Sequence, residues 1–329
     1  MKYWGFKSDI YRSANYNHKT MTINQKSYYI SRINIAIDYI EKNITEPLTL
    51  EKISKAAAIS PYHFHRLFKS YMGENLNQFV RRVKIEKAAN MLYTNPNYSL
   101  TEIALANGYT SSQTFAREFR NFFHTTPKLY QASKIRHKNS NNRKEYLIDF
   151  HYDENNRRPS ISFTSTNQYN MKVEIKTLPD MTLAYIRHIG PYKGNPALFE
   201  KLFNQLCSWA GPRNLINQES KFICIYYDGP EVTDESKLRM DICVNVPEDT
   251  PVDGEIGKQA ISGGEYAIAR CVIKEPKEYE QYWNELYNNW LPGSGYQPDN
   301  KPPFEMYPSD CKQENGDMLV DICIPVKPV

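Results

Sequence analysis

The stretch AAAISPYHFHRLFKSYMG, residues 56–73, sets the interpretation of the first part of this chain. Small residues end one helix, a tight turn follows, and a second helix begins. Ser60 is a favourable N-cap residue, and Pro61 suits the first helical position. Leu67 and Phe68 lie on the apolar side of the second helix, where we expect them to enter a core.

The other side of this second helix carries two histidines, an arginine and a lysine. A metal site, a solvated face and a DNA-reading helix are the three candidate explanations. His63 and His65 are two positions apart and therefore point about 200° apart around a helix, so they cannot converge on one metal ion. No motif for a metal, a cofactor or a phosphate occurs elsewhere, and we expect neither a metal nor a cofactor.

The pattern occurs twice in the chain. Residues 49–73 align with residues 99–124, and each copy has a capped amphipathic helix, a turn and a second capped helix. Two helices joined by a short turn form a helix-turn-helix unit. The second copy also has basic residues at the positions that match Arg66 and Lys69. A face that is merely solvated does not explain this recurrence. DNA reading is therefore the favoured interpretation.

A single helix is expected between the two copies, over residues 75–93. Its apolar residues recur at helical spacing, and 19 residues span about 25 Å at 1.5 Å per residue. Two recognition helices that read adjacent major grooves lie about 34 Å apart. A helix of this length could hold two small modules at that separation.

The charge is distributed unevenly. Residues 1–134 contain 19 Lys and Arg against 9 Asp and Glu, whereas residues 171–329 contain 16 against 24. The first region therefore carries +10 and the last −8. A basic first half and an acidic second half indicate a module that binds a polyanion, followed by one that does not.

Residues 31–134 resemble an AraC/XylS-family DNA-binding domain. The resemblance rests on residues 56–73, on FVRRVKIEKAANML, and on IALANGYTSSQTFAREFRNFFHTTPKLY. It implies seven helices, two of which enter adjacent grooves. By the family's pattern the groups that read base edges are Tyr62, His65, Arg66, Ser112, Gln113 and Arg117. Arg can pair with guanine and Gln with adenine, whereas Lys69 and Arg120 are expected to contact phosphate.

The segments around this domain carry weaker signals. Residues 1–26 are expected to be an N-terminal extension, with the DNA-binding domain at 27–134. Residues 135–170 are rich in Asn, Ser and charge, so we expect a flexible linker with one short strand at 146–150.

All six cysteines lie in the second half, none with CxxC spacing, and several within strand-like apolar runs. Free, buried thiols are the favoured interpretation.

The acidic half is a second duplication. Strand patterns in residues 171–194 precede a helical pattern and two strands, and the same order returns from residue 257. MDICVNV and VDICIPV are matching strands, which place Cys243 and Cys323 at equivalent positions. We expect an α+β domain of two β-α-β-β units with antiparallel strands, pseudo-twofold symmetry and a cleft between the units.

This half, residues 171–329, resembles the GyrI-like effector-binding domain. The matching words are HIGPYKG, IYYDGP and WLPGSGYQPDNKPPFEMY, which ends at Tyr307. In that family the cleft binds small molecules and a glutamate lies at its base, a position that Glu305 occupies here.

The residues around Glu305 allow two interpretations. In a strand, Glu305 and Tyr307 share one face, and the second helix of the domain supplies an aromatic stripe. Such a stripe is usually core, and the carboxylate could instead pair with a fixed Arg or Lys or be solvated. A carboxylate with aromatic walls also suits a lipophilic cation. The expected ligand-binding residues are Glu305, Tyr307, Trp283, Tyr287, Tyr192 and Tyr226.

Together these patterns predict a cytoplasmic transcription regulator that is not an enzyme. An all-α double helix-turn-helix domain would bind double-stranded DNA, and an α+β GyrI-like domain would sense an aromatic or cationic effector. We expect a monomer on DNA, RNA polymerase as a further partner, and no membrane segment. Two rivals stay open: a hydrolase with Glu305 as base and Tyr192 or Tyr226 as its helper, and a protein-interaction module without a ligand.

Overall fold

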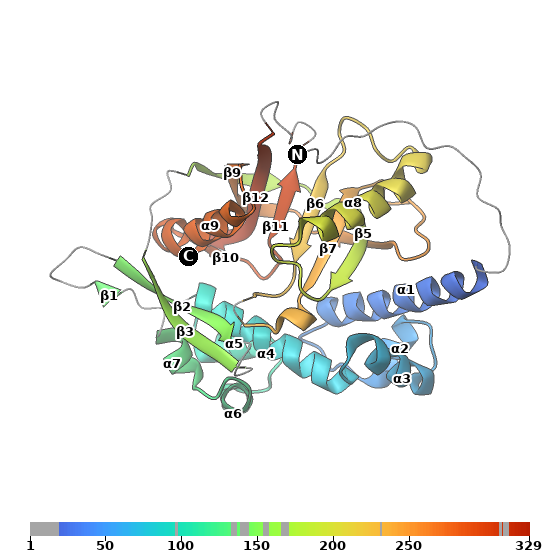
Figure 1. Cartoon of the computed structure of the whole chain (residues 1–329). Coiled ribbons are helices and arrows are strands. Elements are labelled where there is room, and N and C mark those ends of the chain that lie inside the picture. The colour runs from blue at the N-terminus through green and yellow to red at the C-terminus, as the bar shows by residue number, and fades with distance from the viewer. Residues whose placement is uncertain are drawn as a thin grey trace.

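The structure is a computed structural model of the 329-residue chain. It describes residues 20–95, 98–132, 137–138, 145–153, 158–165, 171–230, 232–308, 311 and 316–329. A helical domain and a sheet domain pack against each other, with the helices below the large sheet in Figure 1.

The described part of residues 20–132 forms seven α-helices, as the resemblance implied. They are α1 (Thr20–Lys42), α2 (Leu50–Ala56), α3 (Pro61–Met72), α4 (Leu76–Thr94), α5 (Leu100–Ala106), α6 (Ser112–Phe123) and α7 (Pro127–Ala132). The pairs α2–α3 and α5–α6 are the two predicted helix-turn-helix units. Helix α1 begins within the segment that the sequence analysis assigned to an N-terminal extension.

Both units use the same turn. Ala58 and Gly108 occupy matching positions and both have left-handed backbone, with φ of 51° and 70°. A Cβ at Gly108 would lie 2.6 Å from a backbone oxygen of Ile44, so only glycine fits there without strain. Ser111 caps α6 by accepting from the Thr114 N–H, whereas Ser60 stands at the N-cap of α3 without a side-chain hydrogen bond.

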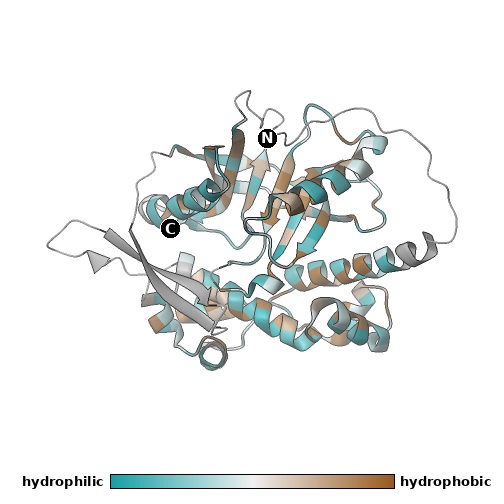
Figure 2. Ribbon diagram, viewed as in Figure 1, coloured by the Kyte–Doolittle hydropathy of each residue, from teal (hydrophilic) through white to brown (hydrophobic). Residues whose placement is uncertain are grey.

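Each unit has its own core, and α4 contributes to both. Its first half packs Leu76, Phe79 and Val83 against the first unit, and its second half packs other apolar residues against the second. The buried positions of α3 are Phe64, Phe68 and Met72, and Leu67 is half-buried and packs against the same core. Figure 2 shows both polar and apolar residues on these helices, as a single buried face requires.

The segment expected to be a flexible linker contains a small antiparallel sheet instead. Its strands are β1 (His137–Lys138), β2 (Glu145–Asp153) and β3 (Arg158–Ser165), in that order. The single strand expected at 146–150 is the centre of β2. Apolar residues alternate with polar ones in both longer strands, and this alternation favours a hairpin over the disorder that the composition suggested.

In the described residues of 171–329, the sheet domain has nine strands, all paired antiparallel. They are β4 (Val173–Leu178), β5 (Met181–Ile189), β6 (Phe222–Tyr226), β7 (Arg239–Asn245), β8 (Gly257–Ile261), β9 (Gly264–Ile273), β10 (Tyr296–Pro298), β11 (Phe304–Tyr307) and β12 (Met318–Pro328). Helix α8 (Pro196–Ala210) follows β5, and α9 (Lys277–Glu285) follows β9 and continues as a π-helix over Leu286–Trp290. Short 3-10 turns cover Gly211–Arg213, Glu235–Lys237 and Leu291–Gly293.

The predicted duplication is present. The two repeats also exchange their first strands, which the sequence did not reveal. The order is β4-β9-β12-β11-β6-β7-β5-β8, with β10 against β12. The two halves of this order mirror each other about the β6–β11 pair. The first strand of each repeat, however, lies beside the second strand of the other repeat.

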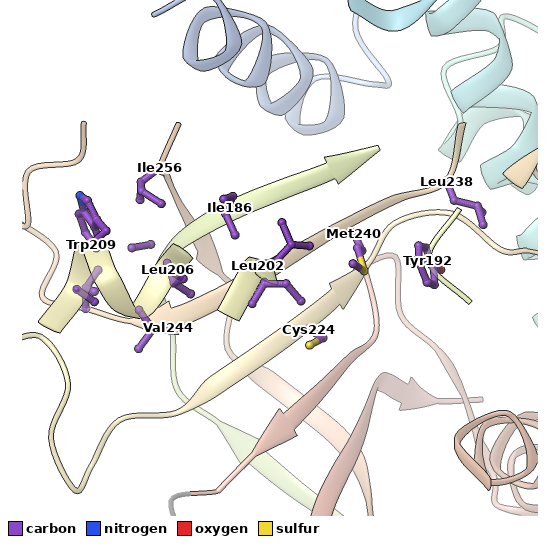
Figure 3. Packing of buried hydrophobic residues seen from close by; sticks show 14 residues of the cluster. Ile186, Tyr192, Leu202, Leu206, Trp209, Cys224, Leu238, Met240, Val244 and Ile256 are labelled. Carbon is purple, nitrogen blue, oxygen red and sulfur yellow. The ribbon is translucent and has the colours of Figure 1, made fainter. Parts of the chain in front are cut away.

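Helices α8 and α9 cover one face of this sheet. Leu202, Leu206 and Trp209 of α8 belong to one buried cluster with Ile186 of β5 and Val244 of β7, as Figure 3 shows. Helix α9 packs in the same way on β9 and β12.

All six cysteines are free, and Cys243 and Cys323 are both buried on the last strand of their repeat. Within the described ranges every helix is too short or too polar to cross a lipid bilayer.

Candidate functional site

The first candidate site is the outer face of α3 and α6. Four of the predicted DNA-contacting side chains are exposed on α3, and on α6 three are exposed while Ser112 is half-buried. The aromatic residues between them, including Phe64 and Phe115, are fully buried. Each helix therefore turns its predicted polar set away from its own core.

On α3 the exposed residues already interact. Tyr62 is 68% exposed, and its hydroxyl lies 3.4 Å from the Arg66 guanidinium. The guanidinium carbon also lies 6.0 Å from the Tyr62 ring centroid. These contacts are long and in solvent, so they leave Arg66 able to reorient toward a base edge.

The second candidate site is a cleft on the helix-covered face of the sheet. Its volume is about 2040 Å³, and its floor is the central pair of strands, β6 and β11. Helices α8 and α9 supply opposite walls. The cleft extends to the helical domain, where Asn90 and Met91 of α4 line it.

Glu305 lies at the base of this cleft and is 2% exposed. Three donors converge on its carboxylate, each at 2.8 Å. Trp283 Nε1 donates to Oε1, and the hydroxyls of Tyr226 and Tyr307 donate to Oε2. A carboxylate offers about four lone-pair sites, so one acceptor site stays open.

The charge of Glu305 has no counterion in the described part of the chain, where none of the Lys and Arg side chains forms an ion pair with it. Burial raises the pKa of the Glu305 carboxyl above its ordinary value, and the three hydrogen bonds partly oppose that rise. Burial also raises the pKa of the Tyr226 and Tyr307 hydroxyls well above 10, so both remain protonated donors.

Aromatic rings surround this carboxylate. Trp283 stacks on Tyr287 with ring centroids 6.0 Å apart, and Tyr226 meets the Trp283 ring edge-on at 6.2 Å. Tyr192 contacts Tyr226 at 5.6 Å. The structure thus brings all six sequence-predicted ligand residues together. Tyr287 belongs to the π-helix, a local distortion that is common at functional sites.

Helix α8 contributes a wall of the cleft that was not predicted from the sequence. Phe199 lies edge-on to Tyr192 at 6.4 Å, and Phe203 lies edge-on to Tyr307 at 6.1 Å. Both lie on the first helix of the domain, for which the sequence had suggested no ligand contact. Their spacing of four residues, in the helix equivalent to the one that carries Trp283, is the signal that could have identified them.

The comparisons with known proteins divide the chain at the same point as the fold. Residues 53–133 match the family described as a helix-turn-helix domain, and residues 171–327 match the GyrI-like small molecule binding domain. A DNA gyrase inhibitor of Edwardsiella ictaluri is 31% identical over 161 residues, which are 48% of this chain and 99% of that protein.

Other similarities cover the helical domain or the sheet domain separately. An uncharacterized HTH-type transcriptional regulator of Staphylococcus aureus (strain COL) is 33% identical over 120 residues, 36% of this chain and 16% of that protein. A solved AraC-type regulator from Chromobacterium violaceum is 29% identical, covering 31% of this chain and 90% of that chain with a TM-score of 0.30. The EcmrR C-terminal domain is 17% identical, covering 49% of this chain and 100% of that chain with a TM-score of 0.39.

Proposed function

We propose that this chain, which belongs to the GyrI-like family over its sheet domain, is an AraC-type transcriptional regulator that reads a specific DNA sequence and senses a lipophilic cation. The cation binds beside Glu305, and its occupancy changes DNA binding. We further propose that the chain acts as a monomer on DNA in the cytoplasm, with RNA polymerase as a further partner.

The proposal for DNA rests on the two exposed helix faces and the +10 charge of residues 1–134. Arg66 and Arg117 are assigned to base edges in adjacent major grooves, because a guanidinium can pair with both acceptors of guanine. Lys69 and Arg120 lie nearer the ends of the same helices and are assigned to phosphates, which fix the register without reading sequence.

The observation that carries the ligand proposal is a buried carboxylate at the base of an aromatic cleft, for which the described residues supply no counterion. Glu305 keeps one acceptor site open and faces the rings of Trp283 and Tyr226. A cation with aromatic substituents would supply the missing charge and would also gain from contact with the ring faces. A neutral or anionic ligand of the same shape would leave the carboxylate uncompensated.

The test titrates the full chain with tetraphenylphosphonium and with tetraphenylborate, which has the same shape and the opposite charge. The cation should bind more tightly than the anion. DNA binding is measured on a duplex selected from a random pool, at two salt concentrations, because phosphate contacts make affinity fall steeply with salt. Equal affinity for the two ions, or DNA affinity independent of salt, would contradict the proposal.

A contact with DNA gyrase is the second candidate function of the sheet domain. It is favoured by the similarity to a gyrase inhibitor over 99% of that protein's length. A gyrase supercoiling assay with the full chain tests it, and inhibition that persists in Glu305→Gln would assign the contact to a surface outside the cleft.

A further inference from the structure

A short segment at the end of β6 connects the carboxylate in the cleft with two buried arginines that contact the helical domain. The segment consists of Tyr226, Tyr227 and Asp228. Tyr226 points into the cleft and donates a hydrogen bond to Glu305 at 2.8 Å. Tyr227 and Asp228, the next two residues, contact side chains that lead to α1.

Tyr227 leads to the first arginine. Its hydroxyl hydrogen-bonds to Asp241 at 2.8 Å, and Asp241 holds Arg187 through two hydrogen bonds of 2.8 and 2.7 Å. Nη1 of Arg187 lies 2.9 Å from the Asp38 carboxylate of α1. Tyr185 donates to the same carboxylate at 2.6 Å.

Asp228 leads to the second arginine. Its carboxylate accepts from Nε and Nη2 of Arg239 at 2.7 and 2.6 Å. Arg239 Nη1 donates to Glu41 of α1 at 2.6 Å, and Glu41 also forms an ion pair with Lys87 of α4. Burial opposes ionisation of Glu41, but Lys87 and Arg239 together lower its pKa to about 2, so it is charged at neutral pH.

Arg187 and Arg239 are paired with carboxylates in the same way, and this pairing allows α1 to move relative to the sheet domain. Each side chain is 1% exposed and has two carboxylates, one from the sheet domain and one from α1. Asp38 and Glu41 are three residues apart and therefore lie on the same side of α1. If α1 moves away, each guanidinium keeps its partner within the sheet domain, so no buried charge is left unpaired.

Helix α1 also packs against the first helix-turn-helix unit, α2–α3. Ile33, Ile37 and Ile40 are buried in the core that supports α3. A shift of α1 therefore changes how the recognition helix is held. Tyr62 and Arg66 are exposed while the sheet domain is docked, so the effect does not require the sheet domain to cover the DNA-binding face.

We propose that Tyr226, Tyr227 and Asp228 transmit occupancy of the cleft to α1, and through α1 to DNA affinity. This inference rests on the proposed ligand site at Glu305. A cation beside Glu305 displaces the Tyr226 side chain, which also lines the cleft. The displaced strand end then moves Tyr227 and Asp228, which contact Asp241 and Arg239.

The pseudo-twofold symmetry of the sheet supplies a matched control. Arg270 and Asp321 form the same cross-strand pair in the second repeat, with two hydrogen bonds of 2.7 Å. The Arg270 side chain is 59% exposed, in contrast to the 1% of Arg187, which α1 contacts. Arg270→Gln therefore removes an equivalent pair at a site outside the proposed path.

The experiment compares the full-length wild type, the double variant Asp38→Asn/Glu41→Gln and the control Arg270→Gln. Tryptophan fluorescence measures tetraphenylphosphonium affinity, and anisotropy measures affinity for the selected duplex with and without that ion. In the wild type and the control, the ion should change DNA affinity about fivefold or more, the lower range of allosteric coupling. The double variant should still bind the ion through Glu305 and should lose that change in DNA affinity.

Survival of the full change in the double variant would overturn the inference. Hydrogen exchange of the amides of residues 33–42 gives a second readout that needs no ligand. Glu305→Gln should alter their exchange rates and Arg270→Gln should not. If the wild type does not bind the ion, the ligand proposal fails, and an altered exchange rate in Glu305→Gln still supports the path. Unaltered exchange in Glu305→Gln would reject the path as well.

Discussion

Replacing Glu305 with glutamine tests the cleft most directly, because the change removes one charge and keeps the shape of the side chain. A glutamine oxygen can still accept from Trp283, whose N–H cannot turn away. The amide NH₂ then faces the hydroxyls of Tyr226 and Tyr307, which can rotate and accept. We therefore expect Glu305→Gln to fold with the cleft intact.

Two opposite effects should follow. Removing one partner of a buried charge pair costs about 2–5 kcal/mol of binding free energy, so the affinity for tetraphenylphosphonium should fall about 30-fold to about 4,000-fold. Folding stability should not fall, because burial raises the pKa of Glu305 and the charged carboxylate therefore disfavours the folded state at neutral pH. The melting temperature of the variant should equal or exceed that of the wild type.

Calorimetry measures the affinity, and a thermal melt measures the stability. Glu200→Gln is the matched control, because Glu200 also lines the cleft but is only half-buried on α8. It should change binding by no more than about 1 kcal/mol, as expected for an exposed charge. Unchanged affinity in Glu305→Gln would refute the assignment, and lost affinity together with a strongly lowered melting temperature would make Glu305 a structural residue instead.

Arg66→Ala and Arg117→Ala should each weaken binding to the selected duplex by about 1–3 kcal/mol and remove protection from half-sites about one duplex turn apart; loss at the same base pairs would contradict the two-groove arrangement. Gly108→Ala should lower the melting temperature of the helical domain more than Gly73→Ala, since both have positive φ but only Gly108 lacks space for a Cβ; equal shifts would argue against that close contact. Affinity for the cation should rise with pH and then level off, because a bound cation lowers the raised pKa of Glu305 and binding below that pKa releases a proton. Calorimetry in buffers of different ionisation enthalpy measures this proton release. An affinity that does not change with pH in the acidic range would contradict the prediction.

The helical domain could be predicted from sequence because its signals are local. Ser99 and Glu102 form a capping box at the start of α5, and Asn75 and Gln78 form another at the start of α4. Glycine at 108 marks the turn. Each of these signals operates within a few residues, so a repeat in the sequence becomes a repeat in the structure.

Strand pairing was less predictable. The pattern of alternation identified the strands of both repeats, but it does not specify which strand lies beside which. The partners β4–β9 and β5–β8 are far apart in sequence, and nothing in either strand marks its partner. The polar composition of residues 135–170 predicted a flexible linker, whereas the alternation of apolar and polar residues in β2 and β3 indicates the hairpin that is present.

The surroundings of Glu305 could be predicted from the sequence, and the domain contact could not, for the same physical reason. Glu305 stands among aromatic residues that a short motif brings together, so its surroundings could be anticipated. Arg187 and Arg239 look like ordinary strand residues, since Asp38 and Glu41 lie about 150 to 200 positions away. Buried ion pairs between distant segments leave no periodic trace in a sequence.

The exchange of first strands also bears on the order in which the protein is made. A chain that has emerged from the ribosome only as far as residue 245 contains β4 to β7, yet β4 has no partner and the outer edge of β5 is unpaired, because both partners come from residues 257–273. The helical domain is already complete at residue 132. Synthesis therefore passes through an interval in which a finished DNA-binding domain carries an unfinished sensor with open strand edges, which are sites of association between chains.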